Sequence, residues 1–394
     1  MSTGYPMTQL LSTLDLAKRA QGLTGPNPLV GAVLVTQEGQ IFQGFHSHYR
    51  GPHAEAVVLA QAGSSARGAQ LFCSLEPCSH SGKGKHNPPC VRAIIDSGVS
   101  QVIIGQPDPN PRVRGQGIRQ LQDAGIQVMV ARDFTDFIRL NPGFVTTHAL
   151  GRPYIHIKAG MTLDGYISTG PDVRTAITNE QARRVVHELR SQVDGVAVGI
   201  GTVLADNPSL DVRLWNYPRN PGMKQPFGVV FDRQLRIPME STLVSRRSEQ
   251  LIIVTSSHLM QSPKAKELEQ LGIRIAGTPD GSLSSALSQL PQFAIQNLLI
   301  EGGSTILGEL FRTGTWDQVS LHIAPKLLGK GVRLFERSGF GNEPTFIEFD
   351  HSSWSILGDH GIYRGYRQNW MGELAISLES ILKQEGMEHV HRIS

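Results

Sequence analysis

The chain has 394 residues, of which 39% are hydrophobic and 6% aromatic, and its formal net charge is +3. This length suggests two or three domains with packed cores. No run approaches the roughly 20 apolar residues of a membrane span, and we see no secretory signal. The mild positive charge suits phosphorylated small molecules and gives little support to a nucleic-acid partner. Three cysteines do not form a disulfide framework, so we expect a cytoplasmic protein.

Helix-like and strand-like segments alternate along the first half of the chain, which predicts an α/β architecture. The expected helices cover residues 7–21, a stretch beginning at His53, 90–97 and 117–124. The expected strands cover residues 31–36, 41–46, 70–75, 101–105 and 126–131.

A second unit begins near residue 153, after chain-breaking residues at 140–143 and 151–153. Its expected elements are a helix over 179–191 and strands over 154–158, 195–200, 228–231, 250–255 and 297–300. At the C-terminus, the spacing of Leu374, Leu378, Ile381 and Leu382 predicts a short amphipathic helix, either peripheral or an oligomer contact. We therefore predict domains at 1–150 and 151–370 and a tail at 371–394.

The stretch from His53 to Cys90 offers an ordered set of metal ligands. His53 is followed by Glu55, and two cysteines, Cys78 and Cys90, each stand after a proline. Three protein ligands leave the fourth position of a tetrahedral zinc ion open for water, as catalysis requires. A histidine, a nearby glutamate and two such cysteines are typical of zinc deaminases that act on amino-substituted bases. In contrast, Cys73 alternates with apolar residues and is expected to be buried.

Further motifs surround these ligands in the first half of the chain. They are Gly25-Pro26-Asn27-Pro28, Gly44-Phe45-His46, Leu75-Glu76-Pro77-Cys78-Ser79-His80 and Asp108-Pro109-Asn110-Pro111. With these motifs, residues 8–150 resemble the deaminase half of the bifunctional riboflavin-biosynthesis deaminase/reductase family. The resemblance implies one zinc ion held by His53, Cys78 and Cys90, with Glu55 as the catalytic residue. It also implies substrate contacts from Asn27, His46 and His80. Extra residues at Lys83–His86 depart from the family pattern.

The second half is similar to the reductase half of the same family, a dihydrofolate-reductase-like α/β domain that uses NADPH. The matching pieces include Lys158–Gly165, Gly201–Leu210, Glu301–Ser304 and Ala324–Lys326. The resemblance implies that the substrate is bound by Arg190, Leu210, Arg213 and Glu301. It implies that the cofactor is bound by Gly160, Thr202, Asp206, Gly302, Gly303 and Ser304.

The resemblance as a whole implies two reactions in riboflavin biosynthesis. A zinc-dependent site deaminates diaminohydroxyphosphoribosylaminopyrimidine, and an NADPH-dependent site then reduces the ribosyl side chain to ribityl. Arg174 and Ala176 stand where the family commonly has serine and tryptophan. One alternative is therefore a pyrimidine deaminase whose second domain is inactive or altered in specificity. A nucleic-acid base deaminase would need basic stripes and exposed aromatic residues, and we find no such stripe. Family members tend to associate, which implies a homo-oligomer.

Overall fold

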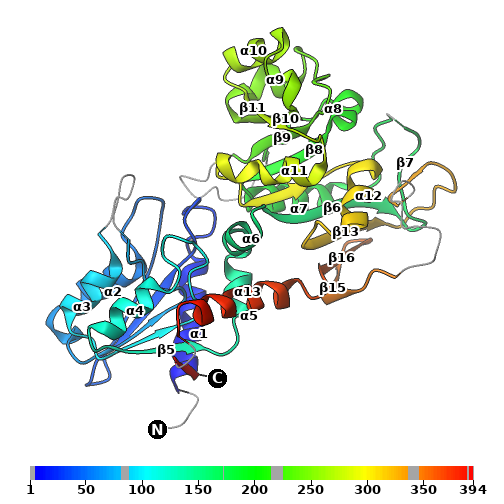
Figure 1. Ribbon diagram of the computed structural model, residues 1–394. Helices are drawn as coiled ribbons and strands as arrows, with labels where there is room; N and C mark the ends of the chain where they lie inside the picture. The colour runs from blue at the N-terminus through cyan, green and yellow to red at the C-terminus, as the bar shows by residue number, and fades with distance from the viewer. Residues whose placement is uncertain are drawn as a thin grey trace. The chain divides into compact units, whose positions relative to one another are not determined.

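The computed structural model describes residues 5–80, 88–171, 173–213, 225–335, 346–387 and 390–393. The Lys83–His86 insertion lies outside these residues. Contacts divide the chain into two compact units, Met1–Leu150 together with Met371–Ser394, and Gly151–Trp370 (Figure 1). The segment from Met371 onward therefore belongs with the first unit in space. Among the described residues, no helix has the length and apolar character needed to cross a membrane.

The first unit is built on a six-stranded sheet with the strand order β17-β5-β4-β3-β1-β2. Strand β1 pairs antiparallel with β2 and β3, whereas β3, β4, β5 and β17 run parallel. The strands are β1 (Gly31–Val35), β2 (Ile41–Phe45), β3 (Gln70–Cys73), β4 (Gln101–Ile104), β5 (Gln127–Ala131) and β17 (His391–Ile393). Strands β3 and β4 are parallel neighbours and end at the same edge of the sheet, which brings the segments that follow them, Leu75–His80 and Asp108–Pro111, to that edge.

Seven helices of the first unit surround this sheet in the described part of the chain. They are α1 (Tyr5–Lys18), α2 (Ala54–Ala62), α3 (Cys90–Ser97), α4 (Gln116–Asp123), α5 (Thr135–Leu140), α6 (Pro142–Leu150) and α13 (Trp370–Gln384). Asn141, between α5 and α6, accepts a hydrogen bond from Leu29 N and donates one to Leu29 O, both at 2.8 Å. The breakers at 140–143 therefore mark a junction inside the first unit.

The C-terminal segment forms helix α13 and, in addition, strand β17. Leu374, Leu378, Ile381 and Leu382 are all buried. Strand β17 then pairs in parallel with β5, and Ile393 joins the apolar core of the first unit. The segment thus covers the sheet edge that β5 would otherwise expose.

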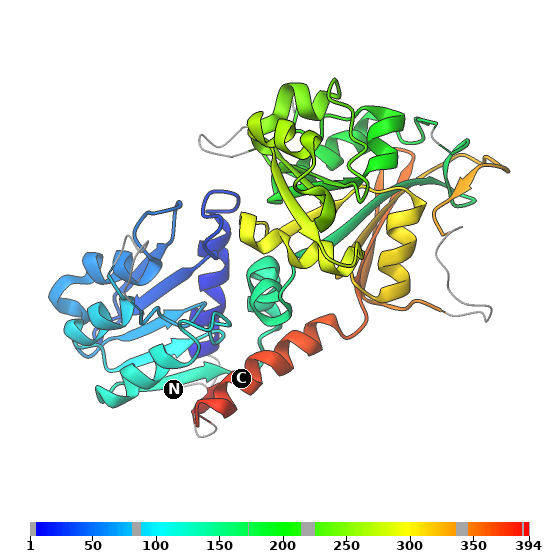
Figure 2. The same cartoon turned by 45° about the horizontal axis from the view of Figure 1, so that its top comes forward.

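The second unit is built on a nine-stranded sheet with the strand order β11-β10-β9-β8-β12-β6-β13-β16-β15. Figure 2 shows the sheet after a 45° turn from the view of Figure 1. The first seven strands in this order are parallel to one another. At the other edge, β16 pairs antiparallel with β13, and β15 pairs antiparallel with β16. The strands are β6 (Tyr154–Thr162), β8 (Gly195–Gly199), β9 (Phe227–Phe231), β10 (Leu251–Ser256), β11 (Arg274–Thr278), β12 (Asn297–Ile300), β13 (Gln318–Ala324), β15 (Phe349–Leu357) and β16 (His360–Arg367). Strands β7 (Tyr166–Ser168) and β14 (Val332–Arg333) form a separate pair.

The helices of the second unit pack on both faces of its sheet, and one apolar core lies on each face. They are α7 (Glu180–Ser191), α8 (Ile200–Asp206), α9 (Thr242–Arg247), α10 (Pro263–Gln270), α11 (Leu283–Ser288) and α12 (Ser304–Thr313). Asn179 caps α7 by accepting a hydrogen bond from Ala182 N, as short polar residues do at helix starts. Strand β6 is anchored at its start, because Asp317 accepts a hydrogen bond from Ile155 N and pairs with Arg152.

Candidate active sites

The three predicted metal ligands of the first unit come together. His53 Nδ1 lies 3.2 Å from Cys90 Sγ and 3.5 Å from Cys78 Sγ, and all three ligand atoms lie within 4.8 Å of one another. Zinc bonds of about 2.0–2.3 Å in a tetrahedral arrangement require ligand atoms about 3.5 Å apart. One imidazole and two thiols at this spacing fit a zinc ion with one coordination position left for water.

Two helix starts and a strand end hold these ligands. His53 is the N-cap residue of α2, and its side chain makes no capping bond, so the ring turns toward the cysteines. Cys90 is the first residue of α3, and its backbone N–H donates to Cys78 Sγ at 3.3 Å. Val91 N donates to Cys78 O, which fixes the main chain of Cys78 as well. The positive end of a helix favours the thiolate form that binds metal.

The protonation of the site follows from burial and from this hydrogen bonding. The pKa of Cys78 is lowered because Cys90 and His53 hydrogen bond to its sulfur, and the pKa of Cys90 is raised by the same shared proton and by burial. Glu55 lies at the start of α2 and is only 3% exposed. Burial raises the pKa of the Glu55 carboxyl, and the charge of His53 offsets part of that rise.

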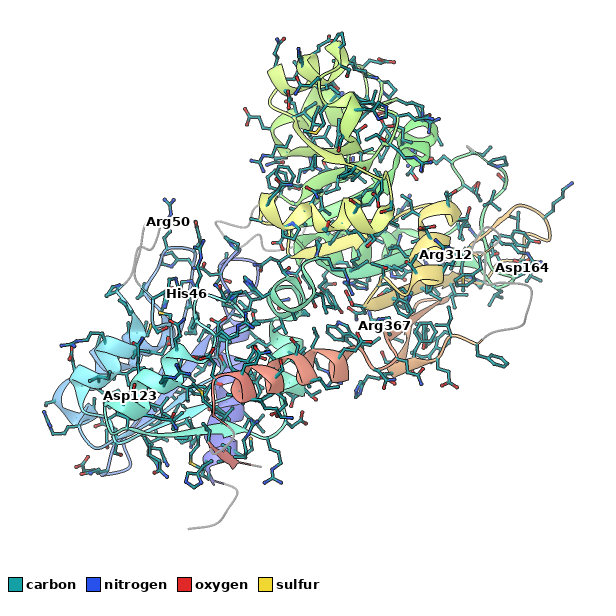
Figure 3. The ribbon with its side chains drawn as sticks, in the orientation of Figure 1. His46, Arg50, Asp123, Asp164, Arg312 and Arg367 are labelled. Carbon is teal, nitrogen blue, oxygen red and sulfur yellow. The ribbon has the colours of Figure 1, made fainter. Side chains whose placement is uncertain are left out.

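Of the three predicted substrate contacts in this unit, Asn27 and His46 lie together. His46, labelled in Figure 3, has its Nδ1 3.0 Å from Pro52 O and its Nε2 3.3 Å from Asn27 Nδ2. Because a carbonyl only accepts, we assign the ring proton to Nδ1, which leaves Nε2 to accept from the Asn27 amide. The rings of His46 and His53 are 5.4 Å apart. His80 follows Cys78 by two residues on the same loop.

The six predicted cofactor residues of the second unit line one pocket of about 850 Å³. They are Gly160, Thr202, Asp206, Gly302, Gly303 and Ser304. Gly302 and Gly303 lead into α12, and a Cβ at Gly303 would meet nothing, so the space in front of this helix start is open. Asp232 borders the same pocket, and its carboxylate oxygen Oδ1 is buried without a hydrogen-bond partner in the described part of the chain. The size of the pocket and the backbone amides at the start of α12 fit a dinucleotide.

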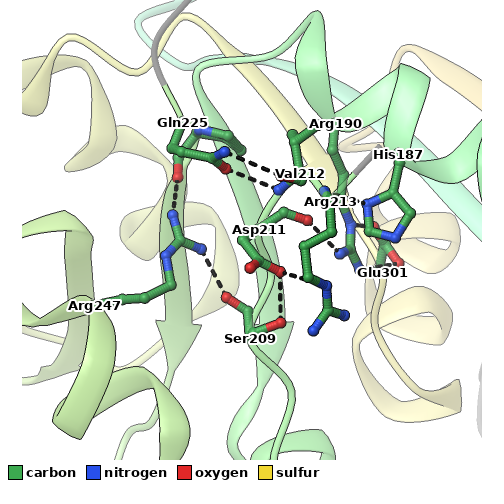
Figure 4. Close-up of polar contacts among 10 residues, drawn as sticks. His187, Arg190, Ser209, Asp211, Val212, Arg213, Gln225, Arg247 and Glu301 are labelled. Carbon is green, nitrogen blue, oxygen red and sulfur yellow. Dashed lines mark hydrogen bonds and ion pairs between the residues drawn. The ribbon is translucent and has the colours of Figure 1, made fainter. Parts of the chain in front are cut away.

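Arg190 and Glu301, whose side chains are 12% and 14% exposed, form an ion pair beside that pocket (Figure 4). Arg190 Nε and Nη2 donate to the two carboxylate oxygens of Glu301 at 2.7 and 3.1 Å, and Nη1 donates to Asp211 O. Burial acts to raise the pKa of the Glu301 carboxyl, but the charges of Arg190 and Lys158 outweigh it and hold that pKa below its ordinary value. The fork of Arg190 is therefore directed at a carboxylate of the protein itself.

Arg213 and Leu210, the other predicted substrate contacts, follow α8 in the chain and are not among the residues that line the pocket. Arg213 is 60% exposed and pairs with Asp211 Oδ1 at 3.2 Å, so its guanidinium is accessible (Figure 4). Leu210 has a positive φ of 51°, and its side chain is buried in a core cluster. Any contact that Leu210 makes with a substrate must therefore come from its main chain.

Two residues that the sequence motifs did not single out for a role, Lys158 and Asp232, also line the pocket. The Lys158 side chain is 13% exposed with its Nζ 4.0 Å from Glu301 Oε2, and loss of contact with water lowers the pKa of Lys158. A lysine inside a mostly buried strand was a usable signal for it. Asp232 carried no such signal, because an aspartate after a strand is common in turns.

Comparisons with known proteins agree with the two-unit division. Residues 8–106 match the cytidine and deoxycytidylate deaminase zinc-binding region, and residues 153–358 match the RibD C-terminal domain. The chain is 36% identical over 321 residues to the riboflavin biosynthesis protein RibD of Aquifex aeolicus, covering 82% of this chain and 87% of that protein. It is 36% identical over 362 residues to the Synechocystis protein of that name, covering 91% and 95%.

Solved structures are similar over nearly the whole chain. RibD of Acinetobacter baumannii, at 31% identity, has a TM-score of 0.83 and covers 93% of this chain and 100% of its own. A Thermotoga maritima protein, at 30% identity, has a TM-score of 0.76 and covers 93% and 99%. It is described as a diaminohydroxyphosphoribosylaminopyrimidine deaminase/5-amino-6-(5-phosphoribosylamino)uracil reductase.

The fold and the two sites define an enzyme that joins a zinc-binding deaminase domain to a reductase domain of the NADPH-dependent kind. The predicted fold class is thereby confirmed. Within that class, the chain belongs to the RibD family of riboflavin biosynthesis proteins.

Proposed function

We propose that this enzyme deaminates diaminohydroxyphosphoribosylaminopyrimidine and then reduces the ribosyl side chain of the deaminated product to ribityl. The observation that carries the proposal is the cluster of His53, Cys78 and Cys90 with Glu55 beside it, in a chain that also holds a dinucleotide-sized pocket. The two activities named for the Thermotoga maritima relative support the same pair of reactions.

In the first reaction, His53, Cys78 and Cys90 would hold the zinc ion, which when bound would supply an activated water at neutral pH. Glu55 takes a proton from the water and delivers it to the ring amine, which leaves as ammonia while the ring carbon becomes a carbonyl. The raised pKa of Glu55 suits both halves of this transfer, because a general acid–base works best with its pKa near the working pH.

We assign the pyrimidine-holding contacts of the first site to Asn27, His46 and His80. Burial is the main cause that lowers the pKa of His46, so this ring is neutral at pH 7. The Nδ1–H of His46 donates to Pro52 O, which fixes the tautomer of the neutral ring. Nε2 of His46 is then available to accept a hydrogen bond from the Asn27 amide. Asn27 can then present its amide to the edge of a pyrimidine.

In the second reaction, the pocket would hold NADPH, which when bound would supply a hydride for the conversion of ribosyl into ribityl, with the accompanying proton taken from water. The backbone amides of Gly302, Gly303 and Ser304 at the start of α12 are suited to the phosphates of NADPH. We assign the substrate phosphate to Arg213, because Arg213 is accessible whereas the fork of Arg190 is occupied by Glu301. Arg190 and Glu301 then form the fixed polar wall beside the sugar.

A deaminase with an inactive second domain is not favoured. Arg174 lines the pocket, and Ala176 is not among the lining residues. The family relatives match through both domains. We also place the enzyme in the cytoplasm, where its three free cysteines remain reduced. Association into a homo-oligomer stays a prediction, which light scattering measures.

Incubation of the purified enzyme with the phosphoribosylated diaminopyrimidine, with and without NADPH, tests the proposal. We expect ammonia release and the mass of the deaminated product in both samples. Only the sample with NADPH should contain a product heavier by two hydrogen atoms. Absence of ammonia release would refute the first reaction, and absence of the heavier product would refute the second.

A further inference from the structure

The carboxylate of Glu76 is buried inside the first unit and is surrounded by backbone N–H groups. It is 2% exposed and makes no ion pair within the described residues. Its Oε2 accepts from Asp108 N at 2.9 Å and Gly115 N at 3.0 Å. Its Oε1 accepts from Gly117 N at 2.9 Å and Ile118 N at 3.3 Å. Both carboxylate oxygens of Glu76 thus accept hydrogen bonds from the main chain of one segment, Asp108–Ile118.

That segment contains the Asp108–Pro111 motif, to which the proposed function gives no role. Asn110 N donates to Asp108 Oδ1 at 2.8 Å, and Arg112 N donates to Asn110 Oδ1 at 3.1 Å, so consecutive turns order the loop internally. Glu76 N also donates to Gln106 O at 3.0 Å, where β3 and β4 end. The loop is therefore fastened to Glu76 at both of its ends, before the motif and at the first turn of α4.

The same contacts reach the metal ligand Cys78, two residues further along. Gly117, in the first turn of α4, has no room for a side chain, because a Cβ there would overlap the carbonyl oxygen of Pro77. Cys78 itself receives hydrogen bonds from the start of α3, through Cys90 N and Val91 N. Cys78 therefore lies between the starts of α3 and α4. Helix α3 contributes the ligand Cys90, and Glu76 connects the Cys78 loop to α4.

We propose that Glu76 is a positioning residue for deamination, which fixes Cys78 for metal binding by clamping its loop to the Asp108–Ile118 segment. This inference rests on the proposed zinc deaminase function. A buried carboxylate that accepts four N–H groups holds its partners in place, because any movement would leave a charged oxygen or a buried donor unsatisfied. Residues that orient a metal ligand in this way commonly change metal affinity or activity about 10- to 100-fold when altered.

The test compares Glu76→Gln with wild type in the full chain. Glutamine keeps the shape of glutamate but turns an NH₂ group toward two backbone N–H groups, so half of the clamp becomes repulsive. We expect zinc affinity and the deamination kcat at saturating zinc each to fall about tenfold or more. We also expect the visible absorption of the cobalt-substituted enzyme to shift, because its intensity and position report the geometry around the metal. Reductase turnover of the same protein measures whether the second unit is unaffected.

Two further variants keep the inference falsifiable. Gly117→Ala presses on Pro77 from the α4 side and should shift the cobalt spectrum and lower kcat even if Glu76→Gln does not fold. Gln122→Ala, at an exposed position of the same helix, should change neither. If both clamp variants lower only the melting temperature and keep the wild-type cobalt spectrum and kcat, Glu76 is merely structural and the inference is wrong. Failure of the proposed function would instead appear as a wild-type enzyme that releases no ammonia.

Discussion

At the scale of single residues, Glu55 and the metal ligands have separable tasks. Glu55 is buried at the start of α2 and its pKa is raised, whereas the ligand atoms are those of His53, Cys78 and Cys90. We predict that Glu55→Gln retains about one zinc per chain and lowers ammonia release by a factor of about 10² to 10⁴, the usual contribution of a positioned acid–base. Metal analysis and an ammonia assay measure both effects. Exposed Glu38→Gln is the control, and full ammonia release by Glu55→Gln would rule out the assigned role.

Glu301 compensates the charges of two largely buried cations of the second unit, Arg190 and Lys158. Its carboxylate accepts the fork of Arg190 and lies 4.0 Å from Lys158 Nζ. We predict that Glu301→Gln destabilises this unit by about 3–5 kcal/mol, because the cations then remain buried without a counter-charge. NADPH oxidation should fall with it, while ammonia release persists.

Chemical unfolding followed alongside both activities measures these effects. The control is Glu180→Gln, which breaks the exposed pair with Arg184 and should cost no more than about 1 kcal/mol. Equal unfolding free energies for Glu301→Gln and wild type would contradict the prediction.

His156 and His322 make the second unit sensitive to acid. Burial is the main cause that lowers the pKa of each ring to about 3, and the ring nitrogens of His322 have no hydrogen-bond partner in the described part of the chain. An unfolded histidine titrates near 6.5, so between pH 6.5 and 3 the unfolded state binds more protons than the folded state. Stability is therefore present above pH 6.5 and falls as the pH drops, by up to about 1.4 kcal/mol per pH unit for each ring.

Unfolding free energies measured between pH 7.5 and 4.5 test this dependence. The variant His322→Phe should make the loss of stability with falling pH shallower, because one of the two rings no longer titrates. Exposed His258→Phe should leave the slope as it is. An unchanged slope in His322→Phe would mean that this ring does not contribute.

At the scale of elements, β17 protects the edge of the first sheet. It pairs with β5, buries Ile393 to 8% exposure, and lets Arg392 donate to Ala131 O while pairing with Glu379. We predict that Ile393→Asp lowers the stability of the first unit by about 2–3 kcal/mol, the worth of burying one aliphatic side chain. Ile376→Asp, on α13 at a 71% exposed position, is the matched control. Thermal unfolding followed by zinc release measures both, and equal effects would argue against an edge-protecting role.

The elements that the sequence predicted well are those with a local signal. Strands β1, β3 and β4 are short, apolar and buried. His53 and Cys90 stand at helix starts, which a preceding proline and the helical spacing of the following apolar residues predict. Strand β17 has three residues with polar neighbours, so only its long-range pairing with β5 makes it a strand. Helices α5 and α6 were missed because proline and glycine at 140–143 read as a boundary, whereas Pro142 begins α6.

The candidate sites divide in the same way. The zinc ligands could be predicted because few residue types bind the metal and their order is specific. The hydrogen bonds of Glu76 could not be predicted from the sequence. Their donors lie 32 to 42 residues away and are backbone N–H groups, which nearly every residue type carries. The ion pair between the Arg190 guanidinium and Glu301 could not be predicted either, because the two residues are 111 positions apart in the sequence.

At the scale of the whole molecule, the residues that serve the two reactions lie in different units. The metal ligands and the core around β1 and β3 belong to the first unit, whereas the pocket and the cores on both faces of the larger sheet belong to the second. A metal-dependent and a metal-independent activity should therefore be separable in one intact chain. A chelator that removes zinc should act on one of them alone.

We predict that chelation abolishes ammonia release and leaves NADPH oxidation unchanged when the deaminated intermediate is supplied. When the diamino substrate is supplied instead, NADPH oxidation should stop as well, because the second site then receives no product of the first. Added zinc should restore both, and chelator already saturated with zinc should have no effect. If the chelated enzyme also fails on the supplied intermediate, the reductase depends on the metal site, and the division into two independent chemistries is wrong.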